Sequence, residues 1–157
     1  MSHNCEAATR QQCAAEIIAT LKKCAPTVLQ NFPVDIAYLH GSVARRTPLP
    51  TSDVDVAVLL SVEVPAHEQL MLELKIQAAL EDACHLSNLD VRSINHAPVM
   101  VQGKIVQEGV RLYSRNNARR VAFEVLTRKK YFDYRPTAQR MQQAYLERIR
   151  QKGLRYG

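Results

Sequence analysis

One stretch of the chain, His40–Leu60, restricts the possible folds more than any other. It reads HGSVARRTPLPTSDVDVAVLL, which predicts the end of one strand, a Gly-Ser turn into a short helical segment, a loop and a second strand. In an extended strand, side chains two positions apart point to the same face. We therefore expect Asp53 and Asp55 to share one face of the second strand. The opposite face is expected to carry the apolar residues Val54, Val56, Val58 and Leu60.

The two aspartates pose an electrostatic problem that a cation solves. Carboxylates held this close repel one another, and burial increases the cost of ionising both. A divalent ion removes the conflict, and magnesium prefers carboxylate oxygens as ligands. Asp53 and Asp55 are thus predicted to bind magnesium. The alternative is that Asp53 is a turn or N-cap residue and Asp55 a solvated strand position.

Gly41 and Ser42 supply the second half of the motif. Glycine allows a ligand or a neighbouring backbone to approach closely, and a hydroxyl residue at a helix start presents exposed N–H groups to an anion. A phosphate-holding turn that faces a carboxylate pair suits metal-assisted nucleotidyl transfer. An ordinary turn at these two residues is the alternative interpretation.

Composition limits the class of protein. The 157 residues suffice for one domain with a sizeable core, and 46% of them are hydrophobic, which excludes wholesale disorder. The chain contains no long apolar run, so we expect no membrane span, and its first residues lack the apolar segment of a secretory signal. No CxxC spacing occurs, and we expect the cysteines of a cytoplasmic protein to be reduced thiols that bind no metal. These are Cys5, Cys13, Cys24 and Cys84.

Positive charge is concentrated in the last third of the chain. Residues 111–157 contain 13 Lys and Arg against 3 Asp and Glu, whereas residues 1–110 contain 8 against 12. This asymmetry indicates that the C-terminal part meets an acidic protein, a nucleotide or a nucleic acid. A solvated basic helix face is the alternative.

The pattern of apolar residues predicts an α+β fold, with a small mixed β-sheet flanked by helices and a basic helical tail. Strands are expected at 34–39, at 89–94 and at 110–114. A further strand, which carries Asp53 and Asp55, is expected to end at Leu60. Helices are expected at 6–24, stopped by Pro26, and at 42–46, 65–84 and 98–106. A further helix begins at Asn116 or Asn117 and breaks at 131–136, and Thr137 caps a last one. Asp35 is expected to be exposed, and His40 to be a structural histidine at a strand end.

The ordered motif resembles a known superfamily. The spacing G-S-x10-D-x-D, from Gly41 to Asp55, is similar to the signature of the DNA polymerase β-like nucleotidyltransferases. That resemblance implies a third carboxylate on a nearby strand, and Asp90 in NLDVR fits. Arg92 beside it is either a structural residue or an ion-pair partner that steers Asp90.

A narrower resemblance covers roughly residues 10–136. The order of GSVAR, SDVDVAVL, LDVRSINHAP, IVQEGVRLYSR and RRVAFEVLTRKKYFDYRP is similar to that of the minimal nucleotidyltransferase antitoxins. Members are encoded beside a HEPN-domain toxin, a ribonuclease. The resemblance implies an enzyme that transfers AMP from ATP to a tyrosine of that toxin and so neutralises it. One departure is Arg46, where such proteins commonly have glycine after the motif arginine.

The resemblance also implies roles for individual residues. Asp53 and Asp55 bridge two magnesium ions, and Asp90 completes the site that activates the incoming hydroxyl. Gly41 and Ser42 hold the terminal phosphates of ATP, and Arg45 or Arg46 offsets charge on pyrophosphate. From the residues themselves we expect 1–136 to form the nucleotidyltransferase domain, and the basic helical tail, 137–157, with its apolar seam, to dock the partner.

Three other functions remain open from the sequence. The first is a binding antitoxin that masks the toxin by contact alone. The second is an enzyme for small molecules, like the antibiotic nucleotidyltransferases, although the chain is short for an additional acceptor domain. Direct binding to nucleic acid is the least favoured, because no known reading module is present.

Overall fold

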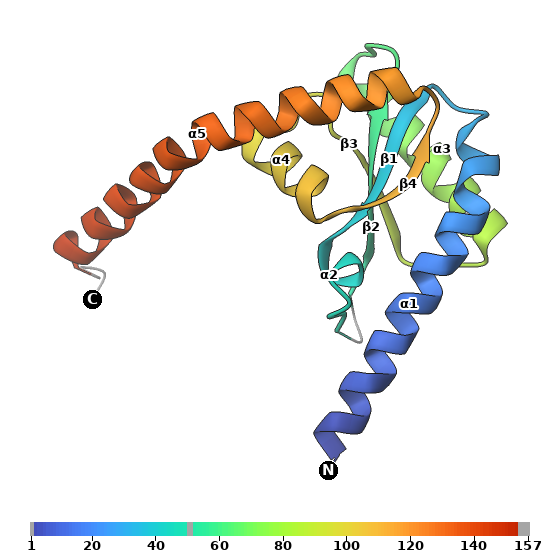
Figure 1. The fold of residues 1–157 in the computed structure, drawn as a ribbon, viewed down its shortest axis with the longest axis horizontal. Helices are drawn as coiled ribbons and strands as arrows, with labels where there is room; N and C mark the ends of the chain where they lie inside the picture. The colour runs from blue at the N-terminus through green and yellow to red at the C-terminus, as the bar shows by residue number, and fades with distance from the viewer. Residues whose placement is uncertain (1, 50–51, 154–157) are drawn as a thin grey trace.

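The order of the strands brings the two halves of the motif to one end of a four-stranded sheet (Figure 1). The computed structural model describes residues 2–49 and 52–153. Its strands are β1 (Val34–His40), β2 (Val54–Leu60), β3 (Leu89–Ser93) and β4 (Val110–Ser114). They lie in the order β3-β2-β1-β4, with β1 antiparallel to β2 and β4 and with β2 parallel to β3. The predicted mixed sheet is confirmed.

Helices cover both faces of this sheet, and α2 lies at its end. They are α1 (Ser2–Leu29), α2 (Gly41–Ala44), α3 (Ala66–Cys84), α4 (Val99–Glu108) and α5 (Asn117–Lys152). Helices α1 and α3 pack on one face, and α4 and α5 pack on the other. None of the described helices combines the length and the hydropathy needed to span a membrane.

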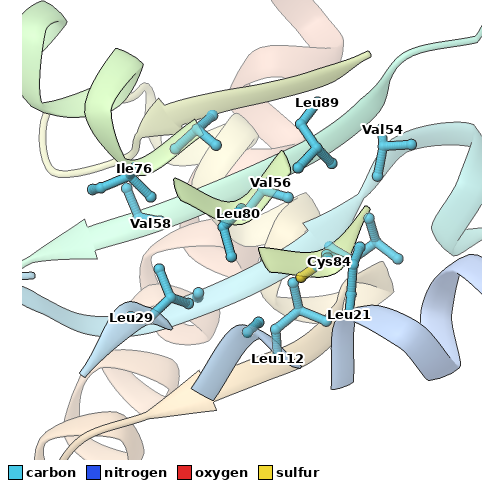
Figure 2. Close-up of a cluster of buried hydrophobic side chains, with 14 of the residues drawn as sticks. Leu21, Leu29, Val54, Val56, Val58, Ile76, Leu80, Cys84, Leu89 and Leu112 are labelled. Carbon is cyan, nitrogen blue, oxygen red and sulfur yellow. The ribbon is translucent and has the colours of Figure 1, made fainter. Parts of the chain in front are cut away.

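Strand β2 has the alternation that its sequence predicts. Val54, Val56 and Val58 point into the cluster formed with α1 and α3, where Figure 2 shows them beside residues such as Leu21 and Leu80. Ala57 and Leu59 point to the opposite face and pack in the cluster under α4 and α5. Since Asp55 has the same parity as Ala57, its side chain belongs to the α4 and α5 face.

Two helices continue through prolines that were expected to end them. Helix α1 runs past Pro26 to Leu29, and α5 runs past Pro136 to Lys152 without the expected break at 131–136. Proline removes one backbone hydrogen bond and bends a helix, but good helix formers such as Arg, Lys, Gln and Met flank Pro136 and sustain the helix on both sides. Residues 50–51 of the predicted loop and 154–157 of the predicted tail lie outside the described residues.

The expectation of four reduced thiols is wrong for one pair. Cys24 of α1 and Cys84 of α3 form a disulfide, and their Cα atoms are 5.8 Å apart. The two positions are 60 residues apart in sequence and meet only because both helices pack on one face of the sheet. Cys13 is free and exposed, and the side chain of Cys5 lies outside the described residues.

Asp35 is buried, contrary to the expectation that it would be exposed. Only 6% of its surface is accessible, and its Oδ2 accepts a hydrogen bond of 2.5 Å from Nε of Arg119 on α5. The charge of Arg119 compensates for the burial of the carboxylate. This ion pair joins the start of β1 to the first turn of α5.

The packing of α4 against α5 depends on a glycine. A Cβ at Gly103 would lie 2.6 Å from Cβ of Tyr131 on α5, and closer still to its ring. Alanine at a helix interior is otherwise preferred over glycine by roughly 0.5–1 kcal/mol. Propensity and packing therefore predict opposite effects of the same substitution.

We expect Gly103→Ala to lower the free energy of unfolding by about 1–3 kcal/mol, because the overlap forces Tyr131 and α5 away from α4. Urea unfolding measures the change, and Gln107→Ala, at an exposed position of the same helix, is the control. A Gly103→Ala variant more stable than the original chain would contradict this account of the packing.

Candidate active site

Three neighbouring strands align His40, Asp55 and Asp90 at the end of the sheet where β1 ends and β2 and β3 begin. His40 pairs with Asp55, and Asp55 pairs with Asp90. Side chains of directly paired residues lie side by side on one face of a sheet. Asp53 immediately precedes β2 and is exposed, whereas Asp55 and Asp90 are half-buried. The three predicted carboxylates thus lie at the same end of the sheet.

The turn after β1 fits closely against the central carboxylate. Gly41 has a φ of +77°, and a Cβ there would lie 2.5 Å from Oδ2 of Asp55. Both the left-handed backbone and the close approach require glycine. Ser42 follows in the half-buried first turn of α2, and its carbonyl accepts a hydrogen bond from the N–H of Thr47. The Gly-Ser turn and the aspartate strand therefore form one unit.

The surroundings of Asp55 and His40 disfavour their charged forms in the metal-free chain. Burial raises the pKa of Asp55 above its usual range, and the nearby carboxylates of Asp90 and Asp53 raise it further, against the opposing effects of His40 and Arg45. Burial also lowers the pKa of His40, although Asp55 and Asp90 act in the opposite direction. Burial therefore disfavours the charged forms of both the imidazole of His40 and the carboxylate of Asp55.

Asp90 has a partner on its own strand. Its Oδ1 accepts a hydrogen bond of 3.0 Å from Nε of Arg92, whose side chain is exposed whereas that of Asp90 is half-buried. The ion pair predicted as one of the two possible roles of Arg92 is therefore present. It holds the carboxylate of Asp90 at the outer side of the carboxylate row.

The two motif arginines differ in backbone and in surroundings. Arg45 has φ −78° and lines a cavity with His40 and Gly41, where it also lies 3.8 Å from a carboxylate oxygen of Glu108. Arg46 has φ +59°, the left-handed region that favours glycine. The chain thus keeps the local turn despite the departure at Arg46, and Arg45 is the arginine beside the cavity.

This cavity, of about 360 Å³, lies between the Gly-Ser turn and the helices α4 and α5. Its walls combine apolar side chains with charged groups: Met100, Val101, Lys104, Ile105, Glu108 and Tyr131 join His40, Gly41 and Arg45. Sequence reasoning missed Lys104 and the role of Tyr131. Met100, Lys104 and Glu108 recur every four residues along one face of α4, which was the signal available.

Comparison with known proteins decides the family. Residues 22–118 match the family "Polymerase beta, Nucleotidyltransferase", a span that contains all of the predicted site residues. The chain belongs to the polymerase β nucleotidyltransferase family. Its sheet, its Gly-Ser turn and its carboxylate row are the parts of the polymerase β-like fold that the sequence predicted.

Solved structures share this nucleotidyltransferase fold. A toxin–antitoxin complex with AMP-PNP superposes with a TM-score of 0.57 at 23% identity, covering 78% of this chain and 93% of that one. The MntA–HepT toxin–antitoxin gives 0.53 at 22%, with coverages of 78% and 91%. A tri-AMPylated Shewanella oneidensis HEPN toxin in complex with MNT antitoxin gives 0.51 at 23%, with coverages of 88% and 98%. No curated protein sequence matches the chain.

The donor set of this nucleotidyltransferase suits magnesium. Among the described residues, no three His, Cys, Asp or Glu side chains converge closely enough to form a ready metal site. The oxygens of Asp53, Asp55 and Asp90 nevertheless have the chemistry that magnesium prefers. The raised pKa of Asp55 among other carboxylates is the kind of conflict that a cation relieves. These three residues are the ones that would hold the ion.

We expect Asp55→Asn to stabilise the metal-free protein near neutral pH. Because the folded state raises the pKa of Asp55, ionisation of this group favours unfolding as pH rises through the interval above its ordinary value of about 3.9. The advantage of the variant should shrink as pH falls below that value. Thermal melts in a chelator measure it, with exposed Asp82→Asn as control. An Asp55→Asn variant that is less stable than the original chain at neutral pH would contradict the unfavourable ionisation of this carboxylate in the folded state.

The turn itself provides a second test of the site. An L-residue in the left-handed region costs roughly 1–2 kcal/mol, part of which the greater unfolded-state entropy of glycine offsets. Arg46→Gly should therefore increase the free energy of unfolding by up to about 1 kcal/mol. Arg45→Gly, at a right-handed position, should give no such gain. Equal effects of the two substitutions in urea unfolding would show that φ is not the cause.

Proposed function

We propose that this nucleotidyltransferase is an antitoxin that transfers AMP from ATP to a tyrosine of a HEPN-domain toxin and thereby neutralises it. The observation that carries the proposal is the register that places Asp55 between His40 and Asp90, with Gly41 closed against its carboxylate. A carboxylate row beside a close-fitting glycine turn can serve transfer of a nucleotide, as the sequence motif predicts.

The comparisons support the choice of nucleotide and acceptor. Among the structures with the same fold, one toxin–antitoxin holds AMP-PNP, and another is an MNT antitoxin bound to a tri-AMPylated HEPN toxin. The sequence identities of 23% support a common fold, and the activity of this chain is proposed from its own site. The arrangement of that site agrees with the reaction in which AMP is transferred.

We propose a role for each residue of the site. The turn at Gly41 and Ser42 receives the terminal phosphates, and Arg45 faces the charge that builds on pyrophosphate. Bound magnesium supplies charge neutralisation at Asp53 and Asp55. The acceptor oxygen forms a bond to the α-phosphorus, the bond to pyrophosphate breaks, and the hydroxyl proton passes to Asp90. The hydrogen bond from Arg92 to Oδ1 of Asp90 would orient that carboxylate.

We assign the cavity beside the turn to the nucleoside. The cavity adjoins Gly41, so a nucleotide whose phosphates lie at the turn can extend into it. Apolar walls from Val101 and Ile105, with the ring of Tyr131, suit a flat base. Lys104 and Arg45 place two cations within reach of phosphate or ribose oxygens.

A second function, masking of the toxin by contact alone, is favoured by one observation. Helix α5 exposes large apolar side chains, among them Met141 and Tyr145, that a catalytic core does not need. Contact and transfer predict different products when the two proteins are mixed. Only transfer leaves a covalent AMP group on the toxin.

The test is to incubate the chain with the HEPN-domain protein encoded beside it, with ATP and magnesium chloride, and to measure intact masses. We expect the partner to gain the mass of one or more AMP groups. Asp53→Ala and Asp55→Ala should abolish this gain while still binding the partner, and Asp82→Ala, on the surface of α3, should behave like the original chain. Transfer at the normal rate by Asp55→Ala would refute the assignment, and neutralisation without any mass gain would establish masking.

A further inference from the structure

The second half of α5 carries an apolar strip with no partner in the described chain. Tyr134, Met141, Tyr145 and Ile149 expose 43%, 62%, 64% and 44% of their surfaces. Their spacings, together with Ala138 between them, follow the three- and four-residue steps that place side chains on one face of a helix. We call these five residues the α5 strip. In Figure 1 this part of α5 extends away from the sheet.

The α5 strip continues the face by which α5 packs on the body. Thr127 is buried on that face, and Tyr131, four residues further on, lies against Gly103 of α4. Tyr134 and Ala138 follow at the next helical steps. The face of α5 that packs against α4 therefore continues beyond the part of the helix that lies on the sheet. It continues as exposed apolar surface, beginning at the residue that lines the cavity with His40 and Gly41.

Acidic and basic side chains lie on different faces of the same helix. Beyond Glu124 the chain contains only two acidic residues, Asp133 and Glu147. At 100° per residue both fall on the side of α5 opposite the strip. Lys130, Arg148 and Lys152 fall at or beside the strip. The apolar strip is thus bordered by positive charge alone, and it complements an apolar surface bordered by acidic side chains.

Pro136 lies inside α5, within the length of the strip. At 100° per residue it falls on the face of α5 opposite the strip, and a proline ring at this position clashes with the carbonyl four residues earlier, here that of Phe132, which kinks a helix. Opening one face bends a helix toward the other, which here is the strip. In Figure 1 the end of α5 accordingly curves to the side on which α4 and α2 lie.

We propose that the α5 strip is the docking surface for the acceptor protein, and that it binds a helix whose apolar face is bordered by Asp and Glu. This inference rests on the proposed function, because it concerns how the acceptor tyrosine reaches the carboxylates. A helix lying along the strip is held beside the cavity, which converts a bimolecular encounter into a nearly unimolecular one. A second copy of the chain is a poorer occupant, since two strips would bring like charges together.

The experiment uses the full chain and the HEPN-domain partner, with two variants matched in charge and spacing. Met141→Asp combined with Tyr145→Asp places two negative charges on the strip. Gln139→Asp combined with Gln143→Asp places the same charges four residues apart on the opposite, exposed face. Circular dichroism checks the helix, and calorimetry measures partner binding and ATP binding.

We expect the strip variant to weaken partner binding at least tenfold, with ATP binding unchanged and with AMP transfer restored at high partner concentration. The opposite-face variant should change partner binding less than threefold. Binding should also weaken as salt is raised, because exposed charges are screened over about 8 Å at physiological ionic strength.

Two results would overturn the docking surface. One is equal weakening by both double variants, and the other is normal partner binding by the strip variant. A chain that is dimeric alone and becomes monomeric in the strip variant would assign the strip to a second copy instead. If the strip variant loses the partner while the original chain binds it without transferring AMP, the docking surface stands and the proposed function fails.

Discussion

The contact between the backbone at Gly41 and the carboxylate of Asp55 is the constraint on which the rest of the site depends. It holds only because β1 and β2 are antiparallel neighbours in a fixed register, with His40 opposite Asp55. The same register, carried across to β3, sets Asp90 beside Asp55. This arrangement has an electrostatic cost, because burial and the neighbouring carboxylates raise the pKa of Asp55. The buried apolar residues on both faces of the sheet keep the strands in place against this repulsion.

The sheet and the carboxylate row were predictable because their signals are local. Period-2 alternation identified β2, and the spacing of glycine, serine and aspartates identified the turn and the strand that it faces. The family match confirms the polymerase β-like fold. The roles of Ser42, Arg45 and the metal ligands remain predictions. Arg46 shows a limit of motif comparison, since this residue has a left-handed backbone although it is not glycine.

Features that depend on tertiary packing could not be predicted from one sequence. The Cys24–Cys84 bond joins residues that only the packing of α1 on α3 brings together. Asp35 is buried because Arg119, far along the chain, pairs with it. Tyr131 lines the cavity because Gly103 lets α5 approach α4. Pro136 was expected to break the last helix, but the residues on both sides favour helix strongly enough to continue through it.

The register between β1 and β2 also bears on how such a protein can diversify. Pairing with β1 positions Asp55 from the strand itself, so the segment between Arg46 and Ser52 does not determine where the carboxylate lies. Loops of this kind tolerate insertions and substitutions better than the elements that they connect. Changes in the length or sequence of this connection are therefore compatible with an unchanged arrangement of the acidic groups on the strands.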